Sequence, residues 1–360
     1  MGIFKFDEIA FNSTEKKKPV DEDKYTYLGL EHLDSDSIYV TRYGADVAPK
    51  GDKLIMKKGD VLFGKRRAYQ KKVAIAPFDG IFSAHGMVLR PKEDVIDKDF
   101  FPMFIKSDYF LDAAIKISVG SLSPTINWRD LKELKFELPS LEEQRKLAEV
   151  LWAIYDMKDK YKKLILATDE LVKSQFIEMF GDSNKYHKKQ ISDVAEVIAG
   201  GDRPKDISEV MTDEYRYPIY ANGIENEGLQ CYSKEFRVDK TAVTISARGT
   251  IGATFIRPPY FTPVVRLITV IPKAELNPVF LKYAIDYAEL ISNGSSQQQL
   301  TIPNVKKIEV VIPPVNKQNN YASFVVQSDK SKFALQEAIK DLDALSKKII
   351  AENLIPAGKE

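Results

Sequence analysis

A run of basic residues around one aromatic side chain offers the clearest chemistry in the sequence. It follows an apolar segment that ends at Phe63. Arginine and lysine bond DNA phosphates or the edges of guanine bases, so the run is a candidate DNA contact. A solvated basic hairpin is the alternative. The candidates are Lys65, Arg66, Arg67, Tyr69, Lys71 and Lys72.

A second candidate segment combines polar residues with glycines. Ser246, Arg248 and Thr250 alternate with small residues, and Gly249 and Gly252 would let the backbone approach a phosphate closely. The segment follows an apolar stretch, as the basic run does. We therefore expect it to be the counterpart of that run in a second, related part of the chain.

Uncharged polar runs form a third set of candidates. Glutamine can bond adenine N6 and N7 together, and hydroxyl groups bond either bases or phosphates. Arg203 and Lys205, which follow two glycines, supply charge in a similar setting. A plain surface loop is the alternative for each segment. The uncharged candidates are Ser121, Ser123, Thr125, Ser295, Ser296, Gln297, Gln298 and Gln299.

Motifs for catalysis are missing. No G-x-x-x-x-G-K-[ST] loop is present, so we do not expect ATP hydrolysis by this chain. The run 257–260, Arg-Pro-Pro-Tyr, is close to the Asn/Asp-Pro-Pro-Tyr motif of adenine methyltransferases. Arginine has only donors, however, and cannot accept a bond from the target amino group. We interpret this run as the proline-stiffened start of a strand, and Glu22-Asp23-Lys24 as a chance match to a nuclease motif.

Bulk composition indicates an ordinary folded protein. The chain has 360 residues, 44% of them apolar, which suits two domains or a little more. Its net charge of +1 gives no general support to DNA binding, so only local charge could provide it. Cys231 is the only cysteine, and the three histidines lack metal-ligand spacing. Without a signal-like or membrane-spanning run, we expect a cytoplasmic protein.

The chain repeats itself. When the sequence is shifted by 174 positions, Gly120 falls on Gly294 and Gln144 falls on Gln318. The same register carries Leu138-Pro139 onto Ile312-Pro313 and continues without a gap to Phe176, which falls on Ile350. So long a match in one register indicates an internal duplication.

Each copy ends in a long segment with helical character. After Pro139 no proline or glycine occurs before Gly181, and apolar residues recur every seven positions. The predicted packing rows are Leu147, Ile154, Tyr161, Thr168 and Gln175, and Val150, Met157, Leu164, Leu171 and Glu178. In the second copy they are Leu335, Leu342 and Ile349, with Ala338 and Leu345. Helices of roughly 38 residues would be about 57 Å long, and we expect them to pack antiparallel.

The expected fold class is α+β, with two mixed α/β domains separated by two long antiparallel helices. The boundaries that we predict are 1–140 for the first domain, 141–183 for the first helix, 184–314 for the second domain and 315–356 for the second helix. Short strands are expected at Asp60–Phe63, Ala242–Ser246 and within Phe261–Ile271.

Taken together, these features resemble the specificity subunits of Type I restriction-modification systems over essentially the whole chain. The resemblance lies in a proline followed five residues later by glutamine at the start of each long helix, and in segments near residues 120, 180 and 191. These segments are Gly120–Gln144, Phe180-Gly181, and Ile191–Glu196 with Gly200-Gly201 and Pro204.

The resemblance implies a DNA-binding subunit without catalytic activity. Each target-recognition domain would bind one half of a split double-stranded DNA site, while the helices set the spacing and dock two modification subunits. Restriction subunits would join the complex, and S-adenosylmethionine, ATP and Mg would bind to the partner chains. No cofactor is expected here. The alternative is a coiled-coil scaffold whose variable domains bind protein.

Overall fold

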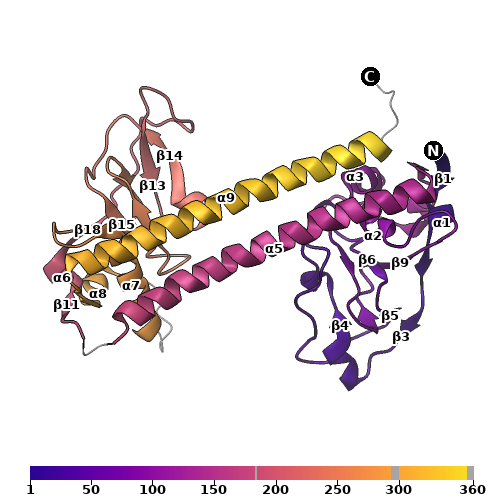
Figure 1. Ribbon diagram of the computed structural model, residues 1–360, viewed down its shortest axis with the longest axis horizontal. Helices are drawn as coiled ribbons and strands as arrows, with labels where there is room; N and C mark the ends of the chain where they lie inside the picture. The colour runs from indigo at the N-terminus through magenta and orange to yellow at the C-terminus, as the bar shows by residue number, and fades with distance from the viewer. Residues whose placement is uncertain (183–184, 293–299, 355–360) are drawn as a thin grey trace. The chain divides into compact units, whose positions relative to one another are not determined.

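The computed structural model describes residues 1–182, 185–292 and 300–354. The chain divides into two compact units. Unit 1 comprises Met1–Tyr161 together with Glu337–Glu360, and unit 2 comprises Lys162–Gln336. Each long helix therefore contributes one part to each unit (Figure 1). Within the described ranges no helix has both the length and the apolarity needed to cross a bilayer.

Unit 1 is built on a four-stranded antiparallel sheet in the order β2-β9-β6-β7. Every residue of the central strand β6 is buried, as expected for a strand covered on both faces. A second sheet has the order β3-β5-β8-β4 and contains one parallel pair, β4 with β8. The strands are β2 Ala10–Ser13, β3 Lys16–Lys17, β4 Tyr27–Leu28, β5 Lys53–Met56, β6 Val61–Phe63, β7 Val73–Ile75, β8 Gly80–Phe82 and β9 Met87–Pro91.

Aromatic rings join the first sheet to the helices of unit 1. Phe63 of β6 and Phe110 have ring centroids 5.8 Å apart, and Phe104 packs edge-on against Phe136 at 5.2 Å. The first part of α5, Leu141–Phe180, packs on this core through Leu151. The remaining elements are β1 Gly2–Lys5 paired with β10 Lys135–Leu138, helices α1 Phe6–Ile9, α2 Phe100–Lys106, α3 Asp108–Lys116 and α4 Trp128–Leu131, and short 3-10 turns at Asp21–Thr26, Leu30–His32 and Ala68–Gln70.

Unit 2 repeats this plan. Its four-stranded sheet has the order β12-β18-β15-β16, which matches β2-β9-β6-β7 strand for strand. A smaller sheet, β14-β13-β17, again contains one parallel pair. The elements are β11 Lys188–Gln190, α6 Ile191–Val194, β12 Ala195–Ala199, β13 Tyr217–Tyr220, a 3-10 turn at Glu225–Gly228, β14 Leu229–Ser233, β15 Ala242–Ile245, β16 Thr254–Arg257, β17 Thr262–Pro263, β18 Ile268–Pro272, α7 Pro278–Ser292, α8 Ile302–Lys306 and β19 Glu309–Val311. The predicted α+β class and internal duplication are confirmed.

One glutamine anchors the start of each long helix in the same way. The buried Gln144 amide donates to the carbonyl of Pro139 at 2.9 Å and accepts from the N–H of Asp97 at 2.8 Å. Gln318 donates to Pro313 at 2.9 Å and accepts from Asn277 at 2.9 Å. In both copies the side chain bonds a buried proline carbonyl and a half-buried backbone N–H, which would otherwise lack these partners. This explains the repeated proline and glutamine spacing.

The long helices are α5 Leu141–Phe180 and α9 Val315–Leu354, each of 40 residues. In unit 1, Lys158 of α5 forms an ion pair with Asp343 of α9. In unit 2, Lys332 lies 2.7 Å from Asp169, and the Tyr321 hydroxyl donates to the Val172 carbonyl at 3.1 Å. Higher numbers on α9 thus meet lower numbers on α5, so the helices are antiparallel, as predicted.

One of the predicted packing rows on α5 is wrong. The row through Leu147 and Ile154 is buried or half-buried, but the second row has Val150, Met157, Leu164 and Leu171 between 44% and 53% exposed. The row one position further on, Leu151, Lys158, Ile165, Val172 and Met179, packs in its place. That row is hard to recognise in the sequence because it contains Lys158. The aliphatic stem of Lys158 is covered, while its charge pairs with Asp343. On α9, Leu345 is likewise 46% exposed.

The run 257–260 does not form the start of a strand at Arg257. Arg257 is the last residue of β16, and the two prolines lead on to β17. Its guanidinium is buried, 3.8 Å from the Tyr220 ring centroid, and donates to Thr244 Oγ1 at 3.0 Å. An ion pair to Glu227 at 3.1 Å compensates its charge. Arg257 therefore stabilises the interior of unit 2.

Candidate nucleic-acid interface

Two of the predicted segments of unit 1 meet in space although about 55 residues separate them in the sequence. The loop between β6 and β7 carries the basic run, and Arg66 forms a β-bridge with Thr125. The Arg67 N–H donates to the Pro124 carbonyl at 2.8 Å, and the Ile126 N–H donates to the Lys65 carbonyl at 2.9 Å. The basic run and the hydroxyl-bearing segment thus form one surface.

This surface exposes only part of the basic run. Arg66, Arg67 and Tyr69 are exposed, and Arg67 adopts a left-handed backbone with φ of 54°. Lys65 is half-buried, and burial together with the charge of Lys16 lowers its pKa. A pocket of about 350 Å³ opens beside the loop, lined by Leu30, Glu31, Arg66, Arg67, Gln70, Lys72 and His85.

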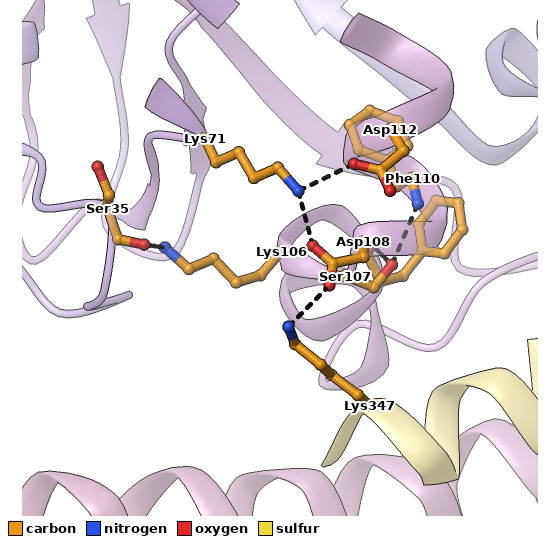
Figure 2. A network of polar contacts seen from close by, with 9 residues as sticks. Ser35, Lys71, Lys106, Ser107, Asp108, Phe110, Asp112 and Lys347 are labelled. Carbon is orange, nitrogen blue, oxygen red and sulfur yellow. Dashed lines mark hydrogen bonds and ion pairs between the residues drawn. The ribbon is translucent and has the colours of Figure 1, made fainter. Parts of the chain in front are cut away.

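The other two lysines of the run bond within unit 1. Lys71 Nζ lies 2.8 Å from Asp108 and 2.9 Å from Asp112, and Figure 2 shows it directed at both carboxylates. Burial would lower the pKa of Lys71, but these hydrogen bonds outweigh it and raise the pKa. Lys347 of α9 approaches Asp108 at 3.4 Å (Figure 2). Lys72 donates to the Leu30 carbonyl at 2.6 Å. Both lysines therefore fix the loop in place.

The hydroxyl-bearing segment forms a narrow loop. The backbones of Val119 and Thr125 exchange two hydrogen bonds, and Gly120 turns the chain with φ of 112°. Ser121 is exposed at the tip, while the Thr125 hydroxyl bonds back to the Ser123 carbonyl at 3.0 Å. The neighbouring Leu122 is 95% exposed. The tip therefore offers one free serine and an apolar side chain to a ligand.

Unit 2 presents the corresponding loop between β15 and β16. The Leu300 N–H donates to the Ala247 carbonyl at 3.2 Å, which repeats the bond from Ile126 to Lys65. Leu300 lies 174 positions after Ile126, in the register of the sequence repeat. Arg248, which is exposed, therefore occupies the place of Arg66. Residues Ser295, Ser296, Gln297, Gln298 and Gln299 lie outside the described residues.

The other predicted residues of unit 2 differ in how accessible they are. Ser246 is buried and accepts a bond from the Gly223 N–H at 3.3 Å, so it supports the loop from inside. The Thr250 hydroxyl is buried and has no partner among the described residues. Arg203 and Lys205 are exposed and line a separate pocket of about 590 Å³ with Lys234 and Arg237.

His85 is a residue of this surface that sequence reasoning missed. It lies in the turn between β8 and β9, and its Nε2 is 3.5 Å from Arg66 Nη1. In the sequence, the three histidines were notable only for lacking metal-ligand spacing. No local pattern could have identified it, because only the pairing of β6 with β9 brings this turn beside the basic run.

The arrangement offers hydrogen-bond donors and positive charge. In the part of the chain that the structure describes, no three His, Cys, Asp or Glu side chains gather as a metal site would require. The exposed groups are guanidinium, hydroxyl and aromatic groups on loops held by a rigid sheet. Such groups suit binding to a phosphate backbone and to base edges.

Comparisons with known proteins point to one family. The model of the Type I restriction modification DNA specificity domain matches twice, at residues 3–167 and 184–342. Two Mycoplasma pneumoniae proteins assigned as type I specificity subunits are 28% and 31% identical over 252 and 249 residues. The alignments cover 64% and 66% of this chain, and 74% and 65% of those proteins.

Solved structures share the fold. A chain from a type I restriction-modification system, described for its complex assembly and conformational transition, superposes with a TM-score of 0.62 at 17% identity. That match covers 98% of this chain and 97% of the other. The S subunit from M. genitalium gives a TM-score of 0.59 at 16% identity, covering 99% and 96%.

Proposed function

The chain belongs to the Type I restriction modification DNA specificity family, and we propose that, as the DNA specificity subunit of such a system, it recognises a split DNA site. Each unit binds one half of the site through the loop that carries Arg66 or Arg248 and the segment bonded to it. The observation that carries this proposal is the duplicated loop pair, in which Arg66 and Arg248 stand at equivalent positions. Family membership also disfavours the alternative of a scaffold that binds only protein.

The long helices set the distance between the two half-sites and dock partner chains. Their outer face supports the docking role, because an apolar row at heptad spacing is half-exposed along α5. Within unit 1, Val150 and Met157 line a groove of about 430 Å³ with Leu342 and Leu345. An amphipathic helix of a modification subunit fits such a groove. Two modification subunits and the restriction subunits assemble on this frame.

The chemistry belongs to these partners. Modification subunits bind S-adenosylmethionine and methylate adenine, and restriction subunits use ATP and Mg to move and cut DNA. The chain itself is not catalytic and holds no cofactor. This division fits the sequence, which has no Walker loop and places a donor-only arginine where the methyltransferase motif requires an acceptor.

The proposal is tested by reconstitution. The purified chain is mixed with DNA and S-adenosylmethionine, with and without its modification partner, and methylated adenines are mapped. We expect methylation only in the presence of the partner, at one split site. Methylation by the chain alone, or methylation without sequence preference in the complex, would contradict the proposal.

A further inference from the structure

The turn between β8 and β9 has an equivalent between β17 and β18. The Gly86 N–H donates to the Ser83 carbonyl at 3.0 Å, and the Leu267 N–H donates to the Val264 carbonyl at 3.0 Å. The third residue of each four-residue turn has a basic side chain. It is His85 in unit 1 and Arg266 in unit 2, and both are exposed. Two copies with little sequence identity thus place the same kind of group at the same point.

In unit 1 this turn adjoins the basic loop directly. The Arg66 N–H donates to the His85 carbonyl at 3.3 Å, and both side chains line the same pocket. His85 is therefore part of the surface that Arg66 and Thr125 form.

In unit 2 an asparagine makes the corresponding connection. Asn222 Oδ1 accepts from the Ala247 N–H at 2.8 Å, and Asn222 Nδ2 donates to the Val265 carbonyl at 2.8 Å. One side chain thus joins the loop that carries Arg248 to the turn that carries Arg266. Both arginines are exposed and belong to one loop cluster.

The backbone of the second turn is in an unfavourable conformation. Val265 has φ of 51° and Arg266 has φ of 58°, so two successive residues with side chains are in the left-handed region. A turn with positive φ at both central residues is formed most easily by Asn-Gly, and a β-branched residue there is rare. Such strain is typical of functional positions, where an unfavourable backbone conformation is retained because it places a side chain.

Close packing holds the strained turn in place. The Val265 N–H donates to the Gly201 carbonyl at 2.9 Å, and the Arg266 N–H donates to Gly200 at 3.1 Å. A Cβ on Gly200 would lie 2.7 Å from the Val264 nitrogen, so only glycine permits this approach. The glycine pair therefore supports the turn that carries Arg266.

We propose that His85 and Arg266 are equivalent DNA-contacting residues, and that Arg266 determines base preference in the half-site bound by unit 2. This inference rests on the proposed function. Arginine is suited to the role because its guanidinium can bond guanine O6 and N7 together. The strained turn fixes the direction in which the side chain leaves the surface, which a flexible loop would not do.

The test uses the full chain in complex with its modification partner, with methylated sites mapped and DNA affinity measured. Arg266→Ala should reduce the preference at one base pair of the unit 2 half-site by roughly 10- to 100-fold and leave the other half-site unchanged. His85→Ala should weaken recognition of the unit 1 half-site alone. Lys189→Ala, which removes an exposed charge from β11 of unit 2, is the matched control and should change neither.

A double variant separates recognition from folding. Val265→Asn with Arg266→Gly supplies the residues that this turn prefers, so the unfolding temperature should rise while the base preference is lost. If Arg266 does not contact bases, the double variant should be stabilised with its base preference intact, and that result would overturn the inference.

Other outcomes are also decisive. If the wild-type complex methylates without sequence preference, the proposed function fails before any variant is compared. If the wild type is specific and Arg266→Ala keeps its preference, only the present inference fails. A uniform loss of affinity across sequences, with a weaker salt dependence, would assign Arg266 to a phosphate and overturn its base-reading role. An unchanged unit 1 half-site in His85→Ala would overturn the equivalence.

Discussion

Lengthening both long helices by one turn should lengthen the unrecognised gap between the half-sites. The perturbation duplicates residues 165–168 in α5 and 333–336 in α9. These points face each other, because Asp169 and Lys332 form an ion pair at 2.7 Å just beyond them. Inserting in both helices lets the contacts on either side of the insertion keep their partners, which a change in α5 alone would not allow.

The magnitude follows from helix geometry. Four residues add about 6 Å at 1.5 Å each, whereas DNA rises about 3.4 Å per base pair. The added length therefore corresponds to one or two base pairs. DNA also turns about 34° per base pair, given about 10.5 pairs per turn. Each added pair twists the second half-site away from its domain, so we expect a gap longer by one base pair.

The assay maps methylated adenines in the reconstituted complex of the wild type and of the duplication variant. Thr168→Ala, which keeps the helix length, is the control and should leave the gap unchanged. Both half-sites should keep their sequences in every variant. An unchanged gap with full activity in the duplication variant would refute the reasoning, since the helices would then be packing surfaces and nothing more.

Three further perturbations test the surface and its supports. Gln144→Ala removes hydrogen bonds from buried backbone groups and should cost about 1–3 kcal/mol of unfolding free energy, measured in urea; stability within 0.3 kcal/mol of wild type would contradict the anchoring role. The pKa of Asp108 is lowered from 3.8 by its hydrogen bond to Lys71, so the pair stabilises the fold above about pH 4 and this contribution is lost as the pH falls further. Asp108→Asn should flatten the pH dependence of the unfolding temperature below pH 4, and an unaltered profile would count against this ion pair. Replacing residues 65–67 with alanine should weaken DNA binding and its salt dependence while sparing the unit 2 half-site, and a change in that half-site's sequence would exclude independent domains.

The sequence predicted the duplication, the fold class and both long helices. These depend on the repeat register and on heptad spacing, which can be recognised without the tertiary structure. Gln144 and Gln318 could be matched by register alone, although nothing local showed that their amides bond loop backbone more than 40 residues earlier in the chain. The choice between neighbouring heptad rows failed on α5. Lys158 looked like a surface residue, and only its distant partner Asp343 makes it a packing residue.

For the predicted DNA contacts, too, the sequence could not reveal tertiary partners. The basic run was visible as a cluster of charge, but Asp108 and Asp112, which hold Lys71, belong to a helix 37 residues away or more. His85 and Arg266 were missed because single basic residues carry no signal until strand pairing sets them beside a loop. The domain boundaries and the DNA contacts remain predictions.

The interleaving of the two units has a consequence for how the chain folds during synthesis. Unit 2 is one continuous segment, Lys162–Gln336, and can form as soon as that segment has left the ribosome. Unit 1 begins first, yet it must wait for the last turns of α9, because Leu354 is buried in its core. The domain that is made first is therefore completed last, and until then its core presents an open apolar surface of the kind that chaperones bind.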